Sequence, residues 1–182
     1  MSAAKEFQAL NIAVLTVSDT RNEQTDTSGL ALTDALKEAG HNSCDKQIVI
    51  DDIYKIRAVI STWIASDDVQ VILITGGTGF TARDSTPEAI KPILDKTVEG
   101  FGELFRQVSF DEIGTSTIQS RAIAGMANKT LIFCMPGSSN ACKTAWNKII
   151  KEQLNATHKP CNFVAQLKQV SDIKVDQCET RG

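Results

Sequence analysis

Glycines and an acid follow one apolar run of the sequence, where side chains and backbone together could bind an anion. The stretch LITGGTGFTARDSTPEA, residues 73–89, leads from an apolar segment through Thr75, Gly76, Gly77, Thr78 and Gly79 to Asp84. Glycine tolerates positive φ and leaves room for a ligand, so several backbone N–H groups of this loop can point one way and hold a phosphate. A tight turn without a ligand is the plainer alternative.

The loop differs from two common nucleotide-binding motifs. No Gly-Lys-Ser/Thr follows it, so it is not a P-loop. Residues 77–82 fit the loose dinucleotide fingerprint, but Thr86-Pro87 places the helix start too late and no acid ends the next strand. These departures argue against a nicotinamide cofactor.

Two acids lie near this loop in the predicted arrangement. Asp84 lies between the glycines and the helix start, where a carboxylate can cap the helix or hold magnesium against phosphates. Asp51 ends a neighbouring predicted strand. A hydrated magnesium ion needs few protein carboxylates when the substrate supplies phosphates, so the two acids could share one ion. Simple capping is the alternative for both.

Other polar residues are candidates for contact with a phosphorylated ligand. Arg83, Arg106 and Arg121 carry the planar donor fork that suits phosphate, although solvated surface arginines are the ordinary alternative. Ser28 can cap a helix or reach a ligand at its positive end. Residues 136–138, Pro-Gly-Ser, form either a rigid turn that lines a cleft or a plain turn.

The elements that must position these residues alternate between strand-length apolar runs and helix-period segments. This pattern is typical of a three-layer α/β/α fold with a mostly parallel sheet. The predicted strands are Ile12 to Val17, Gln47 to Ile50, Val71 to Ile74 and Thr130 to Met135. The predicted helices cover 28–39, 53–63, a segment starting at Thr86, 97–110, a segment from Thr115 or Ser116 to 128, and 140–154.

Ligands of such sheets bind beyond the carboxyl ends of the strands, where loops and helix N-termini converge. The predicted strand exits carry Ser18-Asp19, Asp51-Asp52, the glycine loop and Pro136-Gly137-Ser138. Asp51 or Asp52 is expected to cap the second helix. This convergence is the main evidence from the residues for a single binding site.

Length and composition bound the class of protein. With 182 residues we expect one domain over 1–154 and a polar arm or tail over 155–182 that packs on it. A net charge of -3 argues against a nucleic-acid-binding surface, and the absence of a long apolar run argues against a membrane span, so a cytoplasmic location is expected.

Cysteine and histidine offer little chemistry. The five cysteines contain no CxxC pair and are expected to be buried thiols rather than metal ligands. His41 and His158 are expected to be solvated, so zinc chemistry and a Ser/His/Asp triad are both poor interpretations.

Several motifs together resemble the MoaB/MogA family of molybdenum cofactor biosynthesis proteins, and their details are closest to the MoaB branch. They are TVSDTRNEQTDTSG, ITGGTGFTARDSTPEA, VEGFGELF, IGTSTIQSRAIAG and MPGSSNACKTAW, within about residues 8 to 165. Two positions depart from the family pattern. Ile50 and Ser139 stand where many members have proline.

The resemblance implies a molybdopterin-binding α/β domain that forms trimers or hexamers and is involved with other molybdenum cofactor biosynthesis proteins. It also implies adenylyl transfer, in which the molybdopterin phosphate attacks the α-phosphorus of magnesium-bound ATP. Asp51 and Asp84 match the acids that bind Mg²⁺ or assist catalysis. The matching substrate-binding positions are Ser18, Ser28, Thr75, Gly76, Gly77, Thr78, Gly79, Ser120, Arg121, Pro136, Gly137 and Ser138.

Two functions from different classes follow from the sequence. The leading one is a molybdopterin adenylyltransferase, because both acids are present and such transfers need positioning and charge neutralisation rather than a protein nucleophile. The alternative is a non-catalytic molybdopterin-binding protein or oligomeric scaffold. A generic nucleotide-binding domain is a more remote third possibility.

Overall fold

A mixed sheet of six strands, in the order β2-β1-β3-β6-β5-β4, forms the centre of the protein. The structure is a computed structural model that describes residues 6–169. Four strands are parallel neighbours: β1 (Asn11–Val17), β2 (Asn42–Val49), β3 (Val71–Thr75) and β6 (Thr130–Met135). The other two, β5 (Ile123–Ala127) and β4 (Lys96–Thr97), are antiparallel additions at one edge. The mostly parallel sheet expected from the sequence is confirmed.

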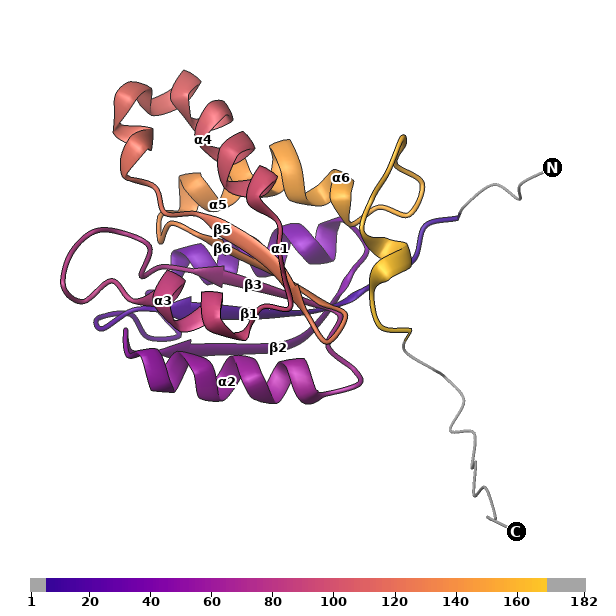
Figure 1. Cartoon of the computed structure of the whole chain (residues 1–182), viewed down its shortest axis with the longest axis horizontal. Helices are drawn as coiled ribbons and strands as arrows, with labels where there is room; N and C mark the ends of the chain where they lie inside the picture. The colour runs from indigo at the N-terminus through magenta and orange to yellow at the C-terminus, as the bar shows by residue number, and fades with distance from the viewer. Residues whose placement is uncertain (1–5, 170–182) are drawn as a thin grey trace, which may run out of the picture.

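Helices cover both faces of the sheet. The α-helices are α1 (Thr27–Glu38), α2 (Ile53–Ala65), α3 (Thr86–Ile90), α4 (Glu99–Ile113), α5 (Ser139–Ala145) and α6 (Lys151–Gln153). A π-helical segment, η3 (Trp146–Ile150), joins α5 to α6, and 3₁₀ turns form η1 (Lys91–Ile93), η2 (Gly114–Gln119) and η4 (Val164–Gln166). In Figure 1, α2 and α3 lie on one side of the sheet and α1, α4 and α5 on the other.

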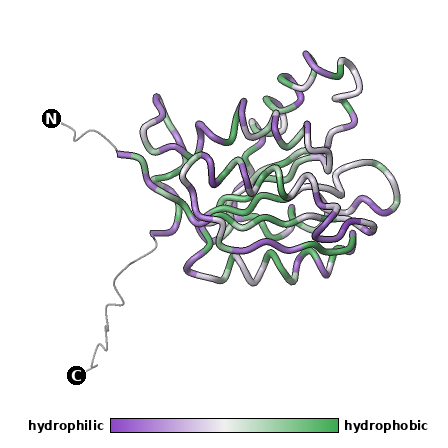
Figure 2. Tube along the Cα trace, turned by 180° about the vertical axis from the view of Figure 1, so that it is seen from behind, coloured by the Kyte–Doolittle hydropathy of each residue, from purple (hydrophilic) through white to green (hydrophobic). Residues whose placement is uncertain are grey.

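Alternation along the central strands gives each face its own core. Ile12 and Val14 of β1 pack in the cluster that contains Leu36 of α1, while Ala13 and Leu15 pack with α2 on the opposite face. A strand buried on both faces reads as a continuous apolar run because successive side chains point to opposite sides. Figure 2 shows these hydrophobic strands enclosed by more polar outer segments.

The helix predicted from Thr115 or Ser116 to 128 is wrong. This segment forms the short η2 turn and then strand β5, which pairs with β6. Asn128 and Lys129 have φ of 45° and 59°, the pair of positive values that a two-residue hairpin turn requires. The small residues of β5 suit either a helix or a strand, so the hairpin partner decides the conformation.

Carboxylates cap the helices that face the predicted site. Asp52 Oδ1 accepts from the N–H groups of Tyr54 and Lys55, so Asp52 rather than Asp51 caps α2. Asp26, not Ser28, caps α1 by accepting from Gly29 N at 2.9 Å. Ser28 therefore does not cap α1 and Asp51 does not cap α2, although the sequence had allowed both.

Several expectations about individual side chains are corrected. His41 is buried rather than solvated, because its ring lies between Phe7 and Trp146 and its Nδ1 accepts from Leu10 N at 3.2 Å. The cysteines divide: Cys134 and Cys142 are buried, whereas Cys44 and Cys161 are exposed. Cys178 lies outside the described residues.

The chain after α6 packs back on the sheet as far as it is described. Ala156, Val164 and Leu167 are buried in the same core cluster as α1 and α5. Residues 170–182, the rest of the predicted tail, lie outside the described part of the chain. Between residues 6 and 169, no helix is long and apolar enough to cross a membrane.

Candidate functional site

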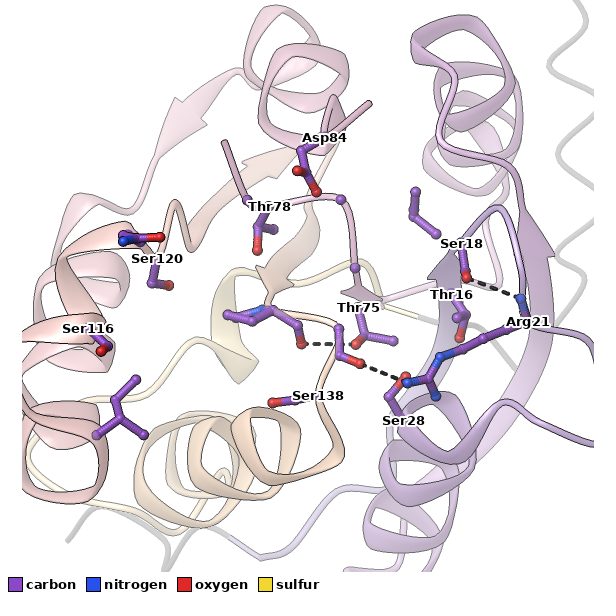
Figure 3. Close-up of a pocket in the computed structure, with 18 residues that line it drawn as sticks. Thr16, Ser18, Arg21, Ser28, Thr75, Thr78, Asp84, Ser116, Ser120 and Ser138 are labelled. Carbon is purple, nitrogen blue, oxygen red and sulfur yellow. Dashed lines mark hydrogen bonds between the residues drawn. The ribbon is translucent and has the colours of Figure 1, made fainter. Parts of the chain in front are cut away.

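A cavity of about 520 Å³ lies beyond the carboxyl ends of β1, β3 and β6. Figure 3 shows loops from these three strands and the η2 segment meeting around it. The predicted site residues that line it are Ser18, Ser28, Thr75, Gly76, Gly77, Thr78, Gly79, Asp84, Ser120, Pro136, Gly137 and Ser138. Asp51 and Arg121 are the two predicted site residues that do not line it.

The glycine loop leaves β3 in a conformation that side chains would prevent. Gly76 and Gly77 have φ of 103° and 63°, so two consecutive residues are in the left-handed region. A Cβ on Gly76 would lie 2.1 Å from Val17 O, which shows how closely this loop passes the end of β1. Thr86 fixes the turn, because its Oγ1 donates to Gly76 O at 2.9 Å and its N–H to Gly77 O at 2.9 Å.

Among the described residues that line the cavity, Asp84 is the only one with an anionic side chain. Its Oδ2 accepts from Thr81 N at 2.8 Å and from Thr81 Oγ1 at 2.6 Å. Burial alone would raise the pKa of Asp84, but these donors and the nearby Arg121 outweigh it and lower the pKa. Asp84 therefore presents an ionised carboxylate to the cavity at neutral pH.

Asp51 lies behind the glycine loop rather than in the cavity wall. Its Oδ1 accepts from Ser85 N at 3.0 Å and from Ser85 Oγ at 2.5 Å, and the residue is 9% exposed. These bonds hold the start of α3 against the end of β2. The sequence alone did not separate this positioning role from a role as a metal ligand.

The two acids nevertheless flank the same short stretch of loop. A Cβ on Gly77 would lie 2.5 Å from Asp51 Oδ2, and a Cβ on Gly79 would lie 2.8 Å from Asp84 Oδ2. Because neither glycine has a side chain, both carboxylates can approach the loop this closely. Asp51 and Asp84 thus lie at one rim of the molecule, as the order of the strand exits predicts.

Arg121 supports the loop from outside the cavity. Its Nη2 donates to Asp84 O at 2.9 Å and its Nε to Thr78 O at 3.3 Å, while Nη1 pairs with Glu88. The guanidinium also lies 5.3 Å from the centre of the Phe80 ring. The structure therefore places this predicted binding residue where it fixes the backbone between Thr78 and Asp84.

The other two candidate arginines also lie outside the cavity. Arg83 pairs with Asp19, and Arg106 Nη1 donates to Ser120 O at 3.3 Å. Arg106 and Arg121 instead line a second cavity of about 560 Å³ between α4 and β5. None of the three lines the cavity, although Arg121 contacts the glycine loop through Thr78 O.

Sequence reasoning missed Arg21, which lines the cavity between the β1 and β6 loops. Its Nη1 donates to Thr27 Oγ1 at 2.9 Å and to Thr25 O at 3.4 Å, and its Nη2 donates to Gly137 O at 3.4 Å. A single polar residue in a long polar loop carries no spacing signal. Its position depends on Gly137, which is 116 residues away in the chain.

A buried carboxylate behind the cavity wall was also missed. Asp26 accepts from Thr16 Oγ1 at 3.0 Å and pairs with Lys46 Nζ at 2.8 Å, with its side chain fully buried. Burial raises the pKa of Asp26, but the Lys46 ammonium and the Gly29 and Thr16 donors outweigh it and lower the pKa. This pair rigidifies the start of α1 beneath Ser28.

Comparisons with known proteins agree with this arrangement. The family described as "Probable molybdopterin binding domain" matches residues 13–156. The chain is 62% identical to the molybdenum cofactor biosynthesis protein B of Escherichia coli (strain K12) over 164 residues, covering 90% of this chain and 96% of that relative.

Solved structures show the same fold. A crystal structure of a molybdenum cofactor biosynthesis protein B matches with a TM-score of 0.80 at 45% identity, covering 82% of this chain and 94% of that one. The tungsten cofactor synthesizing protein MoaB from Pyrococcus furiosus matches with a TM-score of 0.72 at 36% identity, covering 80% and 92%. This chain therefore belongs to the molybdopterin-binding domain family of molybdenum cofactor biosynthesis proteins.

Proposed function

We propose that the cavity binds molybdopterin and that the protein adenylylates it with magnesium-bound ATP. In that reaction an oxygen of the molybdopterin phosphate attacks the α-phosphorus of ATP, and pyrophosphate leaves. The observation that carries the proposal is the meeting of the glycine loop, with Gly76 and Gly77 at positive φ, and the ionised Asp84 at one cavity. Both features suit a phosphorylated ligand.

The residues of the cavity fit a transfer that depends on positioning. No histidine or cysteine lines this cavity within the described residues, but several hydroxyl groups and glycine backbone do. Phosphoryl-type transfer requires alignment of two phosphates and neutralisation of charge more than a protein nucleophile. The backbone N–H groups of Gly77 and Thr78 would orient phosphate oxygens, because Gly76 N already donates to Met135 O at 3.0 Å. The bonds from Thr86 and Arg121 would hold this loop in place.

The acids are suited to magnesium when substrate phosphates supply further ligands. Between residues 6 and 169, no group of three or more His, Cys, Asp or Glu side chains could hold a metal ion by itself. Mg²⁺ commonly takes one or two carboxylates and completes its shell with waters and phosphates. Asp84, which lines the cavity, would hold the ion, whereas Asp51 Oδ2 lies behind Gly77. Such an ion supplies neutralisation of phosphate charge.

A binding function without catalysis is the second candidate. One observation favours it: Asp51 does not line the cavity, and its Oδ1 is occupied by Ser85. In that case the protein would hold molybdopterin without transferring an adenylyl group.

A product assay separates the two candidates. Pure protein is incubated anaerobically with molybdopterin, ATP and magnesium, and pyrophosphate and adenylylated molybdopterin are measured. If the protein is catalytic, the wild type should form both products. Asp84→Asn should form neither, and its melting temperature should not fall, because Asn keeps an oxygen acceptor for Thr81. Binding of molybdopterin without product supports the second candidate. Full turnover by Asp84→Asn would remove the proposed role of this acid.

A further inference from the structure

We infer that Arg21 is a substrate-binding residue of this cavity, and that its guanidinium holds a phosphate group of the substrate. The inference rests on the proposed function, because it concerns the same cavity. It adds a cationic contact that neither the motifs nor the comparisons assign.

Charge within the cavity singles out this side chain. Among the residues that line the cavity in the described part of the chain, Arg21 is the only cation and Asp84 the only anion. Figure 3 shows the guanidinium beside Ser28, on the other side of the cavity from Asp84. A ligand that carries negative charge would therefore meet one cationic group here, away from the carboxylate.

The charge of Arg21 is not neutralised by any carboxylate in the described part of the chain. Within residues 6–169 no carboxylate lies at ion-pair distance from its guanidinium, whereas Arg83 pairs with Asp19 and Arg121 with Glu88. Its acceptors are neutral: the Thr27 hydroxyl and the carbonyl groups of Thr25 and Gly137. The guanidinium is thus held in place by neutral acceptors, with no counterion from residues 6–169.

The hydrogen bonds also leave one edge of the guanidinium available. A guanidinium carries five N–H donors, and three are used by Thr25, Thr27 and Gly137. The Nε–H and one Nη2–H have no acceptor among the described residues. Nε and Nη2 are the two nitrogens on one edge of the planar guanidinium whose donors can bind two oxygens of a phosphate side by side.

The surroundings suit an oxyanion at this edge. Ser138 Oγ already accepts from Ala141 N at 3.1 Å, which leaves its own proton to donate. Ser28 is buried at the start of α1 and lines the same part of the cavity. Asp26 lies beneath it, but Lys46 compensates its charge and Thr16 donates a hydrogen bond to it. The phosphate could come from molybdopterin or from ATP, and the experiment separates these sources.

The test is a set of anaerobic calorimetric titrations with molybdopterin, dephosphorylated molybdopterin and ATP. The proteins are the wild type, Arg21→Gln, Arg21→Lys, and Lys37→Gln as a control that removes one charge from the far end of α1. We expect Arg21→Gln to weaken binding of one phosphorylated ligand roughly ten- to hundredfold, as loss of a charged hydrogen-bonded contact does. Arg21→Lys should fall between, because it keeps the charge and loses the fork.

Titration with dephosphorylated molybdopterin shows whether Arg21 binds the phosphate or only joins the loops after β1 and β6. If Arg21 holds the molybdopterin phosphate, Arg21→Gln and the wild type should bind the dephosphorylated ligand equally. If Arg21→Gln weakens the binding of ATP alone, the phosphate that Arg21 holds belongs to ATP. Equal weakening of phosphorylated and dephosphorylated molybdopterin, with ATP binding unchanged, would reduce Arg21 to a bridge between loops and overturn the inference. Unchanged binding of every phosphorylated ligand would overturn it too.

Two further outcomes separate this inference from the proposed function. If the wild type binds ATP in an Arg21-dependent way but does not bind molybdopterin, the proposed function fails and the inference stands. If the wild type binds neither phosphorylated ligand, both fail. Should Arg21→Gln not fold, the comparison between the wild type and Arg21→Lys decides by the same criteria.

Discussion

The guanidinium of Arg83 binds the carboxylate of Asp19 through two hydrogen bonds, of 2.9 Å from Nε and 2.8 Å from Nη2. The pair joins the loop after β3 to the loop after β1. Asp19 Oδ1 also accepts from Asp51 N at 3.0 Å, so one carboxylate connects three strand exits. The hydrogen bonds from Arg83 lower the pKa of Asp19 and keep it ionised.

Arg83→Gln should loosen the glycine loop without unfolding the protein. The pair is exposed, so its loss should change the melting temperature by less than about 2 °C. Amide hydrogen exchange of residues 76–86 should become faster, because the loop loses its tether to Asp19. Lys55→Gln on α2 is the charge-matched control. Unchanged exchange in the loop would show that Thr86 and Arg121 hold it alone.

Gly77→Ala should disrupt the site and lower stability. The residue has φ of 63°, and a Cβ would lie 2.3 Å from Thr86 Oγ1 and 2.5 Å from Asp51 Oδ2. We expect a loss of about 1–3 kcal/mol in the free energy of unfolding, measured with urea, together with loss of ligand binding. The control is Gly100→Ala in α4, where nothing lies within 4 Å and the helix should gain about 0.5–1 kcal/mol. Wild-type stability and binding in Gly77→Ala would contradict the assigned loop conformation.

Burial of His41 should make stability depend on pH. Burial lowers the pKa of His41, so the folded state keeps the ring neutral while the unfolded state takes up a proton first. This contribution is fully present above the unfolded pKa of about 6.5 and is lost as the pH falls below it towards the folded pKa. His41→Asn, which can still accept from Leu10 N, should therefore show a flatter dependence of the urea midpoint on pH. A slope identical to that of the wild type, with His158→Asn as control, would refute this assignment.

Lys168 should stabilise the fold without affecting the site. Its Nζ donates to Ile64 O at 2.5 Å and Ser66 O at 2.6 Å, at the carboxyl end of α2. Lys168→Met should cost about 1–2 kcal/mol in the free energy of unfolding, because two partly buried carbonyl groups lose a donor. Ligand binding should be unchanged, because Gln70, which also contacts Lys168, precedes β3 and lies at the amino ends of the parallel strands, opposite the cavity. The control is Lys159→Met, on an exposed residue. A stability equal to the wild type would contradict the anchoring role.

The parallel part of the fold and most of the cavity were predictable from the sequence. Continuous apolar runs mark β1, β3 and β6, and parallel strands must end at one edge, so Ser18, the glycine loop and residues 136–138 had to converge. The motif resemblance added Ser120, which the structure places at the same cavity.

What could not be predicted depends on contacts between distant segments. β5 is a strand because β6 offers it a hairpin partner, although its small residues also suit a helix. Arg21 reaches the cavity through Gly137, and Arg121 leaves it for the carbonyl groups of Thr78 and Asp84. His41 is buried because Phe7 and Trp146, far apart in the chain, enclose it.

A crystal structure with molybdopterin bound tests the central claim most directly, because the described residues also line a second cavity of similar size, about 560 Å³ against about 520 Å³. We predict that the molybdopterin phosphate lies in the cavity lined by Gly76, Gly77 and Asp84, at the carboxyl ends of the parallel strands. A ligand bound instead in the second cavity, beside Lys91 and Arg106 between α4 and β5, would contradict the account.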